Sequence, residues 1–205
     1  MKVIYYRALL NSQISDMTYN ERMLYSFFVS KSITYCNDFF DSEGNAIRQD
    51  ELSASIQYDQ FFEIPRMTDA KIAEELHITR RSVITARENL FSNGYTNKNE
   101  YDKLCVYIDE GLLSEGYFEI HFEGKLNGGS LIFYSYLLDK CERYFFKAKK
   151  KCDYCIDTYR YKLAKEFGTS EDSVKKFLRY IYDNKLAKRL KNDKLQLYLT
   201  PQEND

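Results

Sequence analysis

The stretch KIAEELHITRRSVITARENL, Lys71 to Leu90, decides the fold. Its apolar residues form two stripes at helical spacing, the first made by Ile72, Ala73 and Leu76 and the second by Val83, Ala86 and Leu90. This pattern predicts two short helices joined by a tight turn. The second helix begins Thr79-Arg80-Arg81-Ser82, with two cations where the helix dipole favours anions. The stability of the helix therefore does not explain these arginines.

The same pattern occurs a second time in the chain. With a constant shift of 91 positions, KIAEELHITRRSVITARENLFSNGY (71–95) aligns with KLAKEFGTSEDSVKKFLRYIYDNKL (162–186) without a gap. Upstream, LYSFFVSK (24–31) matches FYSYLLDK (133–140) with a shift of 109 instead of 91, so the first copy holds 18 additional residues. These fall near the acid-rich segment 38–62. An ungapped match over 25 positions indicates a duplicated unit.

Both copies have the same order of predicted elements. A capping box at Thr18–Glu21 begins the first helix, 61–64 is a short strand, and 104–108 is a later strand. In the second copy, strands at 186–190 and 195–199 flank a turn with Asn-Asp at its tip. Helix, short strand, two close helices and a hairpin together make a winged helix.

The sequence thus predicts a mainly α fold with small β-hairpin wings (α+β), arranged as two winged helix-turn-helix domains in tandem. We expect domain 1 over residues 1–109, with the acidic insertion near 38–62. A linker that contains a strand is expected over 110–129, and domain 2 over 130–205.

Charge is distributed unevenly along the chain. The 205 residues carry a formal net charge of −1, so nothing global points to a polyanionic partner. Residues 141–200, however, contain 16 Lys and Arg against eight Asp and Glu, and the run Lys147 to Lys151 is the densest part. Joined to a helix-turn-helix fold, this local charge favours a nucleic-acid partner over a merely solvated face.

No feature indicates an enzyme or a bound cofactor. Cys152 and Cys155 have the spacing of zinc ligands, but neither a second Cys pair nor a His pair lies nearby, so we expect no metal. His77 falls at a turn and His121 on the wet side of a strand, and the chain has no phosphate-binding glycine loop. The tyrosines of the second copy suit a core or an interdomain seam better than a surface for stacking single-stranded bases; they are Tyr134, Tyr136, Tyr159, Tyr161, Tyr180 and Tyr182.

The expected cellular location rests on two features that the sequence does not show, a secretory signal and a membrane span. Five cysteines are not preceded by a secretory signal, and no apolar run reaches the ~18 residues of a membrane span. We expect a cytoplasmic protein with reduced thiols and no membrane contact.

In layout the chain resembles tandem winged-helix replication proteins, namely plasmid replication initiators and phage replisome organisers. The resemblance covers about residues 15–200, and the opening Ile4-Tyr5-Tyr6-Arg7 with the stretch 17–25 also looks like the start of such domains. It implies that the outward face of the second close helix contacts DNA, through Arg80, Arg81, Ser82, Thr85 and Asn89 in the first copy and through Lys176 and Arg179 in the second.

The second copy departs from this pattern at its helix start. Glu171 and Asp172 suit the helix dipole but would repel a phosphate. Its hairpin compensates with a cluster of cations that we expect to bind DNA phosphates: Lys188, Arg189, Lys191 and Lys194. The first copy is therefore expected to recognise the DNA sequence, and the second copy is expected to supply contacts to DNA phosphates.

These observations lead to a prediction of sequence-specific binding to double-stranded DNA, in replication initiation or as a replisome organiser. Two alternatives stay open: a transcriptional regulator, or a winged-helix protein-protein interaction module without DNA binding. A homodimer is compatible with each of these roles, whereas contacts with replication proteins are expected for the replication role and not for a transcriptional regulator.

Overall fold

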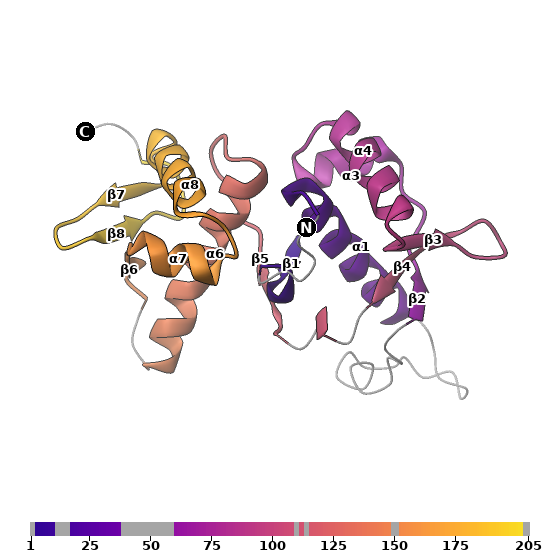
Figure 1. The fold of residues 1–205 in the computed structure, drawn as a ribbon, viewed down its shortest axis with the longest axis horizontal. Helices are drawn as coiled ribbons and strands as arrows, with labels where there is room; N and C mark the ends of the chain where they lie inside the picture. The colour runs from indigo at the N-terminus through magenta and orange to yellow at the C-terminus, as the bar shows by residue number, and fades with distance from the viewer. Residues whose placement is uncertain are drawn as a thin grey trace. The chain divides into compact units, whose positions relative to one another are not determined.

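The computed structural model describes residues 3–10, 17–37, 60–108, 111–112, 115–148 and 152–202. They form helices and small antiparallel sheets, which confirms the predicted α+β class (Figure 1). They divide into two units between Tyr117 and Phe118, except that Leu9 and Leu10 belong with the second unit. The acidic insertion expected near 38–62 lies outside the described residues up to position 59.

The first unit contains the first set of predicted elements. Their order is β1 (Ile4–Tyr6), the 3-10 turn η1 (Arg7–Leu9) at the unit boundary, α1 (Tyr19–Asn37), β2 (Gln60–Glu63), α3 (Asp69–Leu76), α4 (Arg80–Ser92), β3 (Thr96–Lys98) and β4 (Leu104–Ile108). The sheet order is β2-β4-β3, and both outer strands run antiparallel to β4. Helix α1 packs against α4 and β4, so the apolar stripes of the close helices are buried.

The second unit follows the same plan. Its elements are β5 (Tyr117–Glu119) at the unit boundary, α6 (Gly128–Lys147), β6 (Cys155–Asp157), α7 (Arg160–Glu166), α8 (Glu171–Asp183), β7 (Ala187–Arg189) and β8 (Lys194–Leu197). The sheet order is β6-β8-β7, again antiparallel. The core is aromatic: Phe133 packs edge-on against Phe167, with ring centroids 5.0 Å apart, and Phe177 lies 5.5 Å from Phe133.

The internal repeat predicted from the sequence is present in the local structure. Helices α4 and α8 have equal lengths and are separated by the shift of 91, as are β3 and β7. Three backbone positions with positive φ recur at the same shift, in the pairs His77 and Gly168, Gly94 and Lys185, and Asp102 and Asp193. Non-glycine residues adopt this conformation infrequently, so its recurrence supports the duplication.

The first helices of the two units also form matching hydrogen bonds. The Tyr25 hydroxyl on α1 donates to the Tyr107 carbonyl oxygen, and the Tyr134 hydroxyl on α6 donates to the Tyr198 carbonyl oxygen. These tyrosines are related by the shift of 109 and their acceptors by the shift of 91. One buried phenol thus ties the first helix to the final strand region in each unit.

Several predicted details are corrected by the structure. The strands expected at 186–190 and 195–199 are shorter and cover Ala187–Arg189 and Lys194–Leu197. The strand expected within the linker 110–129 covers Tyr117–Glu119, so His121 does not lie on it. In the part of the chain that the structure describes, no helix is both long enough and apolar enough to cross a membrane.

Candidate nucleic-acid interface

The β7–β8 hairpin directs one of its two adjacent cations toward helix α8. Residues paired across neighbouring strands share a face of the sheet. Arg189 pairs with Leu195, which is fully buried, so Arg189 projects from the face that packs on the helices. Lys188 pairs with Gln196 and projects from the opposite face. Asn192 and Asp193 form the hairpin tip with positive φ, a conformation that Asn and Asp tolerate better than most residues.

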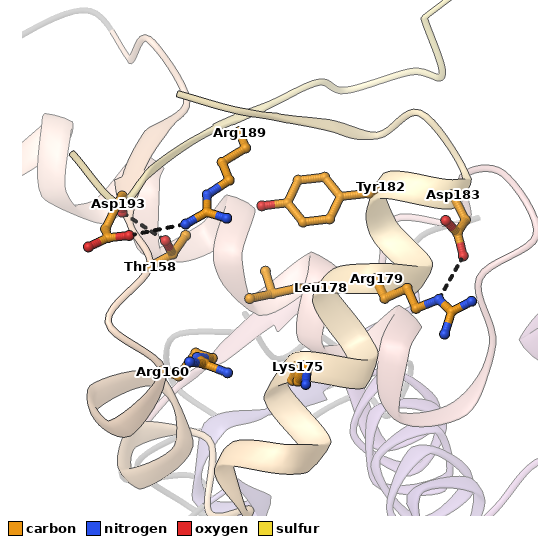
Figure 2. A pocket seen from close by; sticks show the side chains of 9 residues that line it. All are labelled: Thr158, Arg160, Lys175, Leu178, Arg179, Tyr182, Asp183, Arg189 and Asp193. Carbon is orange, nitrogen blue, oxygen red and sulfur yellow. Dashed lines mark hydrogen bonds and ion pairs between the residues drawn. The ribbon is translucent and has the colours of Figure 1, made fainter. Parts of the chain in front are cut away.

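A hollow of about 440 Å³ lies between this hairpin, α8 and the start of α7. Its charged lining consists of the cations Arg160, Lys175, Arg179 and Arg189 and the acids Asp183 and Asp193, with Thr158, Leu178 and Tyr182 completing the wall (Figure 2). Lys175 and Arg179 share a face of α8 because they are four residues apart. We call this hollow the basic groove.

Both acids of the basic groove are held in exposed ion pairs. Arg179 Nε lies 3.7 Å from Asp183 Oδ2, and Arg189 Nη2 lies 3.4 Å from Asp193 Oδ1. All four side chains are 60% exposed or more, so each pair contributes only about 0–1 kcal/mol. Among the described residues, Arg160 and Lys175 have no ion-pair partner. The groove therefore offers a phosphate four cations, two without an ion-pair partner and two held only in weak, exposed ion pairs.

Tyr182 adds a hydroxyl group to this cationic surface. Figure 2 shows the hydroxyl pointing toward the guanidinium of Arg189. Burial raises the pKa of Tyr182, and the positive charge of Arg189 offsets part of that rise. The phenol stays protonated at neutral pH and is able to donate a hydrogen bond to a ligand oxygen.

The equivalent surface of the first unit is not basic. At the shift of 91, the four groove cations correspond to Asp69, Ile84, Glu88 and Lys98. Lys98 alone keeps its charge, and its Nζ lies 2.6 Å from Asp102 Oδ1. Asp69 Oδ1 accepts an ion pair from Arg87 Nη1 at 2.6 Å. Four cations gathered in one groove are therefore a property of the second unit rather than of the duplicated fold.

The residues predicted on the first unit have mixed surroundings. Arg80, Arg81 and Thr85 are exposed on α4. The Ser82 hydroxyl shares a 2.9 Å hydrogen bond with the hydroxyl of Thr79, which caps the helix. The Asn89 amide donates a 2.6 Å hydrogen bond to Glu21 Oε1, and Glu21 is buried on α1. Asn89 itself is exposed, but this hydrogen bond ties α4 to α1, a role that helical periodicity did not indicate.

The residues predicted on the second unit are divided between surfaces. Arg179 and Arg189 meet in the basic groove. Lys176 and Lys191 are exposed but do not line it, and Lys188 and Lys194 project from the other face of the hairpin. Sequence reasoning missed Arg160 and Lys175. The available signal was the four-residue spacing of Lys175 and Arg179. The sequence did not show whether Lys175 or the neighbouring Lys176, three residues from Arg179, shares the groove with it.

The cysteines of the second unit lie apart from the basic groove. Cys141 is buried, which raises the pKa of its thiol to about 12, and Cys152 and Cys155 are partly exposed free thiols. Within the described ranges, no three or more His, Cys, Asp or Glu side chains are arranged to hold a metal ion.

The chain matches no protein-family model, and no curated protein is similar enough to count as a relative. A functional conclusion must therefore come from the geometry of the site.

Proposed function

We propose that the chain binds double-stranded DNA through two winged helices in tandem, and that the basic groove of the second unit holds the phosphate backbone. The observation that carries the proposal is the groove itself, where α7, α8 and the hairpin each contribute at least one cation. In a winged helix, the face between the second close helix and the wing lies against DNA. Phosphate contacts by Lys and Arg supply most of the sequence-independent affinity for a duplex.

Sequence specificity is proposed for the first unit. Arg80 and Arg81 are exposed at the first turn of α4, where the helix dipole disfavours a cation. An arginine at the start of such a helix can form a bidentate contact to a guanine edge in the major groove. The resemblance to plasmid initiators and phage replisome organisers supports replication initiation as the cellular role.

The repeat provides a matched pair of variants that test the groove. Arg189→Ala and Lys98→Ala remove equivalent wing cations and break equivalent ion pairs. Arg189→Ala is expected to weaken binding to every duplex and to reduce the slope of log K against log salt by about 1. Lys98→Ala should bind like the wild type, because Lys98 is paired with Asp102 and the neighbouring helix carries Glu88 in place of Arg179. Fluorescence anisotropy with labelled duplexes measures both.

Two outcomes would contradict the proposal. One is a wild-type protein whose duplex affinity does not depend on salt. The other is an equal effect of the two substitutions, since the basic groove would then have no special part in binding.

A further inference from the structure

A second hollow in the second unit is lined by exposed aromatic rings. It has a volume of about 480 Å³ and lies among α6, β6 and the start of α7. Tyr144 and Tyr159 line it and are 67% and 43% exposed, and Tyr161 is 59% exposed beside Tyr159, with the two ring centroids 6.3 Å apart. The Lys162 ammonium lies 4.9 Å from the centre of the Tyr159 ring and 5.9 Å from that of Tyr161. We call Tyr144, Tyr159, Tyr161 and Lys162 together the aromatic cluster.

For these tyrosines, exposure corrects one of the two places expected for the tyrosines of the second copy, the core. Tyr134 and Tyr136 are buried, as expected, but Tyr159, Tyr161 and Tyr180 are exposed. The buried pair lies on α6, whereas the exposed tyrosines lie at the start of α7 and on α8.

The stability of the fold does not explain Tyr159 and Tyr161. Tyr159 stands at the N-cap of α7 and forms no side-chain capping bond. Thr68, its equivalent in the first copy, caps α3 by accepting a 3.3 Å hydrogen bond from the Lys71 amide. Tyr161 corresponds to Ala70. The second copy therefore lacks a stabilising cap and exposes two rings, a local departure that is expected at a binding surface.

The charges around the aromatic cluster are mostly balanced. Glu166 is paired with Lys140 and accepts a 2.7 Å hydrogen bond from the Tyr136 hydroxyl. Asp157 is directly opposite Lys194 across the β6–β8 pair. A nearly neutral aromatic surface suits a flat, uncharged nucleobase, and Lys162 between the rings suits the phosphate beside it.

We propose that the aromatic cluster binds unpaired bases of single-stranded DNA next to the duplex in the basic groove. The start of α7 joins the two sites, because Arg160 lines the basic groove while Tyr159, the preceding residue, lines the aromatic hollow. The preferred ligand is then a junction of double- and single-stranded DNA. This inference rests on the proposed function in taking DNA as the ligand.

The test compares a blunt duplex with the same duplex carrying a single-stranded thymidine tail, by fluorescence anisotropy. The variant Tyr159→Thr/Tyr161→Ala introduces the residues of the first copy, which restores a capping residue and should leave the fold intact. The wild type should bind the tailed duplex more tightly than the blunt one. The variant should lose this advantage, by roughly fivefold or more for each ring that stacks on a base, and still bind the blunt duplex normally.

A second variant separates stacking from hydrogen bonding. Tyr159→Phe/Tyr161→Phe keeps both rings and should keep the advantage of the tail. Loss of the advantage in this variant, or equal affinity of the wild type and Tyr159→Thr/Tyr161→Ala for the tailed duplex, would overturn the inference while leaving blunt-duplex binding to support the proposed function. Tyrosine-dependent binding of the tail without binding of the blunt duplex would instead contradict the proposed function and support the aromatic cluster.

Discussion

Arg189 and Lys98 occupy the same position in two copies of one hairpin, yet their surroundings differ. Each pairs with an aspartate four residues later, at 3.4 Å for Arg189 and 2.6 Å for Lys98. The difference is on the neighbouring helices, where the other three groove cations of the second copy are replaced in the first by Asp69, Ile84 and Glu88. Because potentials sum over nearby charges, these replacements change the electrostatic potential that a ligand meets at the wing cation.

Asn89 provides a test of packing against DNA contact at a single residue. Asn89→Ala removes the 2.6 Å hydrogen bond to Glu21 Oε1 and leaves a buried carboxylate oxygen without that donor. We expect the free energy of unfolding to fall by about 1–3 kcal/mol. Thr85→Ala, one helical turn earlier on the same exposed face of α4, is the control and should change stability little. Urea denaturation measures both variants.

The same two variants bear on DNA binding. Asn89→Ala should keep the duplex affinity of the wild type once measured where the protein is fully folded. A large loss of affinity without a loss of stability would show that Asn89 contacts DNA after all, and that its bond to Glu21 is not essential to the fold.

At the scale of elements, helices α4 and α8 differ most at their first turn. Thr79 and Ser170 cap them alike, each accepting a hydrogen bond from the amide three residues later. Helix α8 then continues with Glu171 and Asp172, while α4 continues with Arg80 and Arg81. One duplicated helix thus has a start that favours stability, and the other has a start that favours an anionic partner.

This contrast predicts opposite effects on stability and binding. Arg80→Glu/Arg81→Asp copies the start of α8 into α4 and should raise the free energy of unfolding by about 0.5–2 kcal/mol. The same substitution should weaken DNA binding, with a larger loss on a preferred site than on random duplex. Urea denaturation and anisotropy measure the two effects. Greater stability with unchanged affinity would mean that the start of α4 does not face DNA.

The elements were predictable because their signals are local. Capping residues and apolar spacing indicated α4 and α8, and the shift of 91 carried the assignment from one copy to the other. The basic groove was not predictable, because it depends on strand register. Lys188 and Arg189 are adjacent cations, and a slip of one residue would exchange the faces from which they project. Arg160 was missed because its partners in the groove come from α8 and β7.

At the scale of the whole molecule, a net charge of −1 conceals two regions of opposite sign. Residues 141–200 hold 16 of the 30 Lys and Arg but only eight of the 31 Asp and Glu. The remaining sequence is acidic, and it should repel a duplex wherever no local cation compensates. A charge distribution of this kind steers a polyanion to one region of a protein without raising the total charge.

The salt dependence of binding tests which cations of that region bind phosphates. The structure gives two sets of equal charge, Lys175, Arg179 and Arg189 in the basic groove and Lys188, Lys191 and Lys194 outside it. Replacing the groove set by alanine should flatten the slope of log K against log salt by about 0.9 for each phosphate that the protein no longer neutralises. The outside set removes the same net charge, so it controls for long-range attraction and should change the slope less. If the outside set flattens the slope more, the duplex backbone follows the other face of the hairpin, and the basic groove does not hold the phosphates.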